Sequence, residues 1–196
     1  MSVKELEERV MLTKNQYLNI EDFLKSTYEN YRITHQKNRY LDDNKRTINS
    51  LRHVLRIRSF THSKNRELTY KVDGVDGDIE YNQILTYYWF RKLTQESRLL
   101  PGEVSEALLK DNVDINSLKV LVDLRTRRLE VSLKDYTIVL DANLYNDIVD
   151  YNLEVESNIS KEHAKKVILD FCKKFDLTYQ DDYVVKSLRA LNSIKS

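Results

Sequence analysis

Hydrophobic and polar residues alternate along several stretches of the chain, as in β-strands that are buried on one face only. The alternation predicts six strands, over residues 3–11, 53–60, 67–72, 126–133, 136–141 and 150–156. A further short strand is expected over residues 37–42. The link between the strands at 53–60 and 67–72 is short and polar, so these two are expected to form a hairpin.

Other stretches carry apolar residues at the three-to-four-residue spacing of an amphipathic helix. One such helix is predicted from Thr13 to about Tyr31, because Thr13 and Gln16 have the spacing of a capping box. A second begins after Ser160, a good N-cap residue. The aromatic-rich stretch 80–94 is also interpreted as a helix that packs into the core, and a short helix is expected after Pro101. Residues 183–195 are expected to form a short strand or a short helix.

The polar faces of the predicted strands are strongly charged. Their ionisable residues are Glu5, Glu7 and Arg9, then Arg56 and Arg58, Lys71, Arg128 and Glu130, Asp141, and finally Glu154 and Glu156. Two interpretations are open: these faces lie in water, or the sheet curls so that they line an interior while helices cover the apolar face. The second requires every buried charge to be paired or to meet a ligand. It would suit a polyanion with a metal ion, because basic side chains neutralise phosphates and carboxylates bind Mg²⁺ or Mn²⁺.

Composition narrows the function classes. The 196 residues suffice for one domain with a real core, and we predict a single domain over residues 1–196. The 32 Lys and Arg nearly balance the 31 Asp and Glu. The basic residues alternate with acids, which argues against a nucleic-acid partner. No apolar run is long enough to span a membrane, and nothing in the sequence indicates an oligomer.

The single cysteine, Cys172, allows no internal disulfide and fits the reducing cytoplasm, and no apolar signal region follows the charged Lys4. Cys172 lies among the apolar positions of a predicted helix and is expected to be a core thiol rather than a nucleophile. The four histidines lack zinc-type spacing. Only three glycines are present and no glycine-rich phosphate loop occurs, so side chains would have to hold any phosphate.

The order of the charged motifs resembles a known family. Glu5-x-Glu7-x-Arg9 is similar to the E-x-E-x-K signature of the CYTH superfamily, the triphosphate tunnel metalloenzymes. The further segments that match in order are Arg39-Tyr40-Leu41-Asp42, Leu55-Arg56-Ile57-Arg58, Leu68-Thr69-Tyr70-Lys71, Arg128-Leu129-Glu130, Leu140-Asp141, Asp150-Tyr151-Asn152-Leu153-Glu154-Val155-Glu156 and Lys186-Ser187-Leu188-Arg189. The resemblance covers nearly the whole chain and is nearest to compact, single-domain bacterial members. Two departures are Arg9 in place of the usual Lys and Asp43 where Thr often stands.

This resemblance implies an α+β fold in which eight antiparallel strands close into a barrel, a tunnel with a charged interior and helices packed outside. Members bind triphosphate groups with a divalent metal. By resemblance the metal ligands are Glu5, Glu7, Glu154 and Glu156. The phosphate-binding residues are Arg9, Arg56, Arg58, Lys71, Arg128, Lys186 and Arg189. For Glu130 and Asp141 two roles stay open, orienting the basic side chains or binding a second metal ion.

We therefore expect a hydrolase that depends on Mg²⁺ or Mn²⁺ and releases the terminal phosphate of inorganic triphosphate or of a small organic triphosphate, such as a nucleotide or thiamine triphosphate. The general base is not assigned; Lys71 and a glutamate such as Glu7 are the candidates. Arg9 can only bind, because arginine is not deprotonated in proteins. Two alternatives are an adenylyl cyclase of the same fold and a module that binds polyphosphate or nucleotides without turnover.

Overall fold

A computed structural model describes residues 6–61, 63–72, 79–181 and 183–194 of the chain. Its strands form one eight-stranded antiparallel sheet in the order β1-β8-β7-β6-β2-β3-β4-β5. The strands are β1 (Glu7–Leu12), β2 (Arg32–Asp42), β3 (Val54–Phe60), β4 (Arg66–Val72), β5 (Ile79–Leu85), β6 (Lys119–Ser132), β7 (Tyr136–Tyr145) and β8 (Ile148–Ser157). The chain divides into two compact units, the first made of Met1–Lys4, Gln36–Arg125 and Lys186–Ser196, the second of Glu5–His35 and Thr126–Val185.

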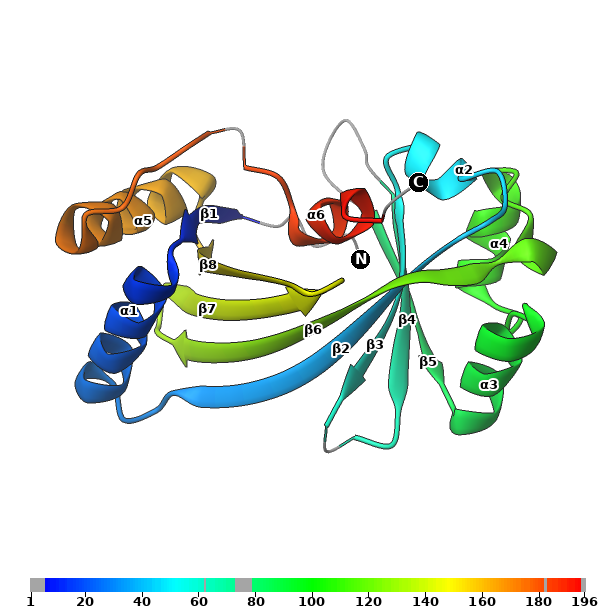
Figure 1. Ribbon diagram of the computed structural model, residues 1–196, viewed down its shortest axis with the longest axis horizontal. Helices are drawn as coiled ribbons and strands as arrows, with labels where there is room; N and C mark the ends of the chain where they lie inside the picture. Colours follow the sequence, from blue (N-terminus) through cyan, green and yellow to red (C-terminus); the bar gives the residue numbers. More distant parts are fainter. Residues whose placement is uncertain (1–5, 62, 73–78, 182, 195–196) are drawn as a thin grey trace. The chain divides into compact units, whose positions relative to one another are not determined.

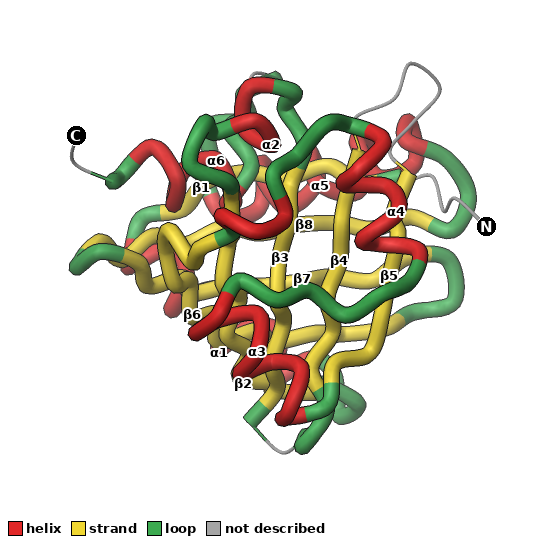
Figure 2. Tube along the Cα trace, turned by 90° about the vertical axis from the view of Figure 1, so that its right-hand side faces the viewer, coloured by secondary structure: helices red, strands yellow, loops and turns green. Residues whose placement is uncertain are grey.

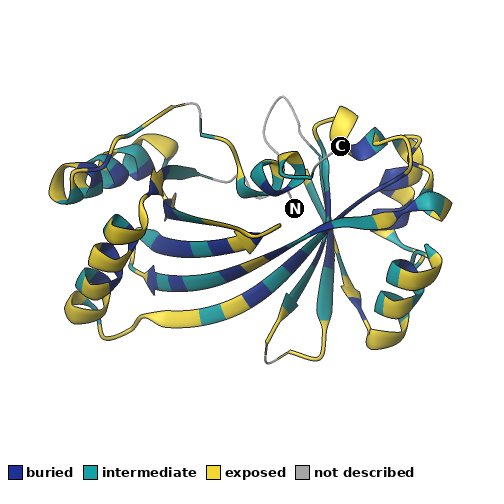
Figure 3. Ribbon diagram, viewed as in Figure 1, coloured by how far each residue is buried: buried dark blue, intermediate teal, exposed yellow. Residues whose placement is uncertain are grey.

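In the second unit two helices cover the apolar face of β1, β8, β7 and the end of β6 (Figure 1). Helix α1 (Lys14–Thr27) starts at Thr13, whose side chain accepts from Gln16 N while Gln16 Oε1 accepts from Thr13 N, so the predicted capping box is confirmed. Helix α5 (Lys161–Phe175) starts at the predicted cap Ser160. Both helices are buried on one side and exposed on the other (Figure 3), which leaves the opposite, charged face of these strands uncovered by them.

In the first unit α3 (Tyr87–Glu96) and α4 (Glu103–Lys110) lie across β3, β4 and β5 (Figure 2). The core beneath them is built from the apolar positions of the strands, including Leu55, Ile57, Leu68 and Tyr70. Two short helices complete this unit, α2 (Thr47–Ser50) and α6 (Lys186–Asn192). The single-turn 3-10 helix η1 (Ile115–Ser117) precedes β6.

The structure corrects the prediction for residues 80–94. This stretch is not one helix: Ile79–Leu85 form strand β5 and a helix begins only at Tyr87, with Thr86 as its N-cap. The reason is that β5 lies at the end of the strand order and buries only Leu85, so its sequence carries little alternation. Smaller differences are that α1 ends at Thr27 rather than near Tyr31, and that β2 is longer than the predicted strand over 37–42.

The antiparallel sheet with helices is confirmed, whereas its closure into a barrel is not. In the described part of the chain the strand order ends at β1 and β5, and no pairing joins these two strands. The single domain over residues 1–196 likewise stays a prediction. None of the described helices has the length and apolar character needed to cross a membrane.

Candidate functional site

Three carboxylates converge on the charged face of the second unit. Glu7 lies on β1 and pairs across the sheet with Glu156 on β8. Two residues further along β1, on the same face, Arg9 pairs with Glu154. Because alternate residues of a strand share a face, Glu154 and Glu156 stand side by side with Glu7. One carboxylate oxygen from each of the three residues lies within 4.8 Å of the others. Glu154 is buried, Glu7 is largely buried and Glu156 is half exposed.

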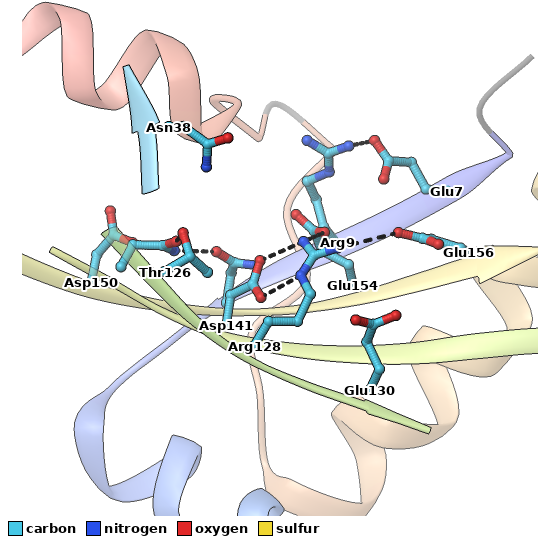
Figure 4. A network of polar contacts seen from close by, with 12 residues as sticks. Glu7, Arg9, Asn38, Thr126, Arg128, Glu130, Asp141, Asp150, Glu154 and Glu156 are labelled. Carbon is cyan, nitrogen blue, oxygen red and sulfur yellow. Dashed lines mark hydrogen bonds and ion pairs between the residues drawn. The ribbon is translucent and has the colours of Figure 1, made fainter. Parts of the chain in front are cut away.

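Arg128 on β6 joins this cluster to a fourth acid, Asp141 on β7 (Figure 4). Its Nε and Nη2 atoms donate to the two Asp141 carboxylate oxygens at 2.8 and 2.7 Å, and Nη2 also donates to Glu154 Oε2 at 3.2 Å. A weaker ion pair reaches Glu156 at 3.9 Å. Although burial opposes the charge, Asp141 and the two glutamates raise the pKa of Arg128 above its ordinary value. Arg128 therefore acts as a fixed counter-ion for the acids.

Arg9 is the second cation of this face. Its guanidinium forms an ion pair with the Glu7 carboxylate. The guanidinium also lies over the Tyr183 ring, with Cζ 5.0 Å from the ring centroid. The Arg9 side chain is only 15% exposed, so both contacts are shielded from water. Arg9 thus lies beside the carboxylates, as the sequence predicted.

Next to Asp141 the same face carries further polar side chains that the predicted set of site residues did not include. Asn143 accepts from Thr126 Oγ1 at 2.8 Å and donates to Asn152 Oδ1 at 2.8 Å and to Asp150 Oδ1 at 3.0 Å. Asp150 in turn accepts from Tyr145 OH at 2.5 Å. These residues follow the charged ones at intervals of two along β6, β7 and β8. Asp150 and Asn152 already stand in the segment Asp150–Glu156 that carries the family resemblance. Extending the alternation by one step past Arg128 and Asp141 would have found Thr126 and Asn143 as well.

The remaining basic residues of the prediction belong to the first unit. Arg56 and Arg58 on β3 share one face with Lys71 on β4, opposite the apolar core. Arg58 Nε donates to Asn38 Oδ1 at 3.2 Å. Arg56 Nε is buried and has no hydrogen-bond partner among the described residues. Lys186 and Arg189 lie three residues apart on α6, where side chains at this spacing are neighbours.

Other predicted residues have different surroundings. Glu5 lies outside the described residues. Glu130 shares the charged face, but its resolved partner is the exposed Arg32, at 3.4 Å, rather than the carboxylate cluster. Asp43 is fully buried and accepts from the backbone N–H groups of Lys45, Thr47 and Asp114, so it organises a turn.

Of the residues set aside as structural, Cys172 is buried in the core, as predicted. Burial raises the pKa of its thiol. His53 contacts Tyr70 OH at 2.9 Å and His163 contacts Ser157 Oγ at 2.9 Å. Both rings therefore have side-chain partners, and His53 also lies 3.5 Å from a carboxylate oxygen of Asp111. His62 lies outside the described residues.

The donor chemistry of the cluster fits a divalent metal. Carboxylate oxygens are the ligands that Mg²⁺ and Mn²⁺ prefer, and these three come from two hydrogen-bonded strands that fix their spacing. Four acids, with Asp141, face two arginines at this site. A cation held among the three glutamates would meet a carboxylate oxygen from each of them.

Comparisons with known proteins show which chains this protein is similar to. The family model described as "CYTH domain" matches residues 3–180. The Bacillus subtilis protein named "Putative triphosphatase YjbK" is 31% identical over 160 residues, which are 78% of this chain and 77% of that protein. A Bacillus halodurans crystal structure, described as "a putative adenylate cyclase", matches with a TM-score of 0.83 and 26% identity over 95% of this chain and 96% of its own.

A structure from Hippeastrum matches with a TM-score of 0.79 over 95% of this chain and 94% of its own. Its description is "Putative adenylyl cyclase HpAC1 from Hippeastrum reveals a dominant triphophatase activity". At 18% identity this likeness concerns the fold alone. The family match over nearly the whole chain and the YjbK relative lead to one conclusion: the chain belongs to the CYTH family.

Proposed function

We propose that this protein is a divalent-metal-dependent hydrolase that releases the terminal phosphate of inorganic triphosphate or of a small organic triphosphate, such as a nucleotide or thiamine triphosphate. The observation that carries the proposal is the convergence of Glu7, Glu154 and Glu156 on one strand face, with one oxygen of each within 4.8 Å of the others. The name of the YjbK relative supports the same reaction class.

The metal is proposed to be Mg²⁺ or Mn²⁺, held by Glu7, Glu154 and Glu156, with Glu5 added from the motif. When bound, it would supply Lewis acidity toward phosphate oxygens and favour ionisation of a bound water. Glu154 is proposed as the anchor ligand, because it is buried and Arg128 fixes its orientation through the 3.2 Å hydrogen bond. Asp141 is proposed to position Arg128 rather than to bind a second metal, because it accepts both of the arginine's short bonds.

The triphosphate is proposed to be held by Arg9, Arg56, Arg58, Lys71, Arg128, Lys186 and Arg189. The buried Arg56 Nε supports this assignment, because a buried donor without a partner is costly unless a ligand meets it. The basic residues would stabilise negative charge on the leaving phosphates. The general base stays unassigned between Lys71 and a glutamate such as Glu7. We further propose that the two units act as one domain whose sheet closes into a tunnel, and that the protein works in the cytoplasm.

Incubation with Mg²⁺ or Mn²⁺ and a panel of inorganic triphosphate, ATP and thiamine triphosphate tests the proposal. We expect phosphate release from at least one of them, and loss of that release in Glu154→Gln. This variant keeps the shape of the side chain but removes the charge that a metal requires. If no triphosphate in the panel is hydrolysed with either metal, the hydrolase proposal is wrong.

The adenylyl cyclase alternative is favoured by the description of the Bacillus halodurans structure. Chromatography of the ATP products separates the two reactions, because a cyclase yields cyclic AMP and pyrophosphate whereas a hydrolase yields ADP and phosphate. A binding module would bind tripolyphosphate, as measured by calorimetry, and would yield neither set of products.

A further inference from the structure

The segment between α5 and α6 contacts both faces of the first strand. Tyr179 OH donates to Glu8 Oε2 at 2.5 Å, on the face that α5 covers. Four residues later Tyr183 lies over Arg9, whose guanidinium carbon is 5.0 Å from the ring centroid. Glu8 and Arg9 are consecutive residues of β1, so their side chains point to opposite faces. Tyr179 and Tyr183 therefore contact β1 from opposite faces, and β1 stands at one end of the described strand order.

The Tyr179 end of the segment is anchored independently of Arg9. The Lys165 ammonium lies 5.2 Å from the Tyr179 ring centroid and pairs with Asp181 at 2.9 Å. Lys161 adds an ion pair to Glu8 at 3.8 Å. These contacts fix the segment on α5 and on the apolar side of β1. Tyr183, which contacts Arg9 on the charged side, is therefore only four residues from the anchored Tyr179.

On the charged side, Arg9 is bounded by an acid and a ring. Glu7 pairs with the guanidinium, and Tyr183 contacts it as a cation–π partner. A planar guanidinium can stack on a ring while its donors stay directed in the plane, whereas an ammonium has no plane to orient. The ring thus limits the directions in which the Arg9 donors can point. Arg9 pairs across the strands with Glu154, and Glu7 with Glu156; both glutamates are candidate metal ligands.

We propose that Tyr183 is a positioning residue for Arg9, and that it holds the guanidinium beside the carboxylate cluster in the orientation that meets a phosphate group of the bound triphosphate. This inference rests on the proposed function and adds a residue to it that no motif contains. Tyr183 acts through Arg9 and does not itself take part in the reaction.

The test compares Tyr183→Leu, which removes the ring, with Tyr183→Phe, which keeps it. For hydrolysis of inorganic triphosphate we expect Tyr183→Leu to raise KM by about twofold to fivefold, the factor that a cation–π contact of ordinary strength represents. The change in kcat should be smaller, because the ring orients a binding group. Tyr183→Phe should return KM toward the wild-type value. Val185→Ala, at an exposed side chain of the same segment, is the matched control.

A double-mutant cycle separates positioning from a general structural effect. In an Arg9→Ala background no guanidinium remains to be oriented, so Tyr183→Leu should raise KM no further. The contact itself can be followed by NMR of the Arg9 Nε–Hε group, whose ring-current shift should vanish in Tyr183→Leu and persist in Tyr183→Phe. An equal rise of KM in both backgrounds, or an Arg9 signal that is unchanged in Tyr183→Leu, would overturn the proposal.

The two proposals fail in different ways. A wild-type protein that neither hydrolyses nor binds any triphosphate of the panel in the presence of Mg²⁺ or Mn²⁺ overturns the proposed function and the role of Tyr183 with it. If ATP or thiamine triphosphate is the substrate, the same variants are compared with that substrate. If it binds without hydrolysis, calorimetric affinities replace KM in the same cycle. Turnover or binding that responds to Arg9 but not to Tyr183 overturns the positioning role alone.

Discussion

Replacing Arg128 by methionine tests whether this arginine is the counter-ion of the acidic cluster. Its guanidinium donates twice to Asp141, which is fully buried, and once to Glu154, whose side chain is 3% exposed. Methionine keeps most of the volume of the side chain but carries no charge. The variant therefore removes one cation from two buried carboxylates with little change in packing.

Removing one partner of a buried ion pair costs about 3–5 kcal/mol. We expect the lower end, about 3 kcal/mol, because the Arg128 side chain is itself 17% exposed and water can reach part of the space it leaves. For a chain of this size such a loss lowers the melting temperature by about 6–12 °C. A divalent metal bound by the same carboxylates would restore about 2.7 kcal/mol at a concentration one hundred times its Kd.

The assay is thermal unfolding of wild type and Arg128→Met, each with and without Mg²⁺ or Mn²⁺. We expect the variant to be less stable without metal and to gain more from metal than the wild type does. The matched control is Arg127→Met, because Arg127 is the next residue of the strand but lies on the opposite face, paired with Tyr17 and Glu21 at 2.6 Å each. Its loss should destabilise the protein without any special response to metal.

Two results would refute this reasoning. If Arg128→Met melts at the wild-type temperature without metal, the arginine does not stabilise the carboxylates. If metal stabilises Arg127→Met as much as Arg128→Met, the metal does not bind at the cluster on the charged face.

Three further predictions concern single side chains. Glu154→Gln should lower metal-dependent phosphate release by more than about a hundredfold, since even residues that only support metal ligands are worth up to that factor; circular dichroism should show that the fold is kept. Although burial favours its neutral form, Lys25 and Arg127 lower the pKa of Glu21 below the ordinary 4.5. The ionised Glu21 carboxylate then stabilises the fold fully above pH 4.5, and this stabilisation is lost as the pH falls through the lowered pKa. The difference in melting temperature between wild type and Glu21→Gln should therefore be constant above pH 4.5 and shrink below it. Asp43→Ala removes a buried carboxylate that accepts four hydrogen bonds, and it should cost about 2 kcal/mol in chemical unfolding, whereas an unchanged midpoint would contradict its role in the turn.

The strands that bury one face could be predicted from sequence, because their apolar and polar residues alternate strictly. Strand β5 could not, because its residues do not alternate in this way. In β5 the apolar residues Ile84 and Leu85 are adjacent, and aromatic residues follow at once after Thr86. The run therefore resembles one continuous buried segment, for which periodicity cannot separate strand from helix. The available signal was Thr86, a good N-cap residue that marks the start of α3.

The predicted site shows the same limit. The alternation could place Arg128, Asp141 and Glu154 on one face, but not in contact, because they lie on three strands whose register is set by pairing. The resemblance assigned Arg128 to phosphate, and its contacts in the structure are with acids. Tyr183 lay beyond prediction altogether, because it belongs to an irregular segment and meets Arg9 only through the fold.

The charges of the two units differ in a way that bears on the proposed reaction. In the second unit Glu7 pairs with Arg9, and Asp141, Glu154 and Glu156 pair with Arg128, so four carboxylates gather around two guanidinium groups on this face. In the first unit the polar face of β3 and β4 carries Arg56, Arg58 and Lys71 together with the acid Glu67, and Glu80 of β5 pairs across the sheet with Lys71. A cation is favoured by the first arrangement and a polyanion by the second. Under the proposed function, metal affinity should therefore depend on the second unit and triphosphate affinity chiefly on the first.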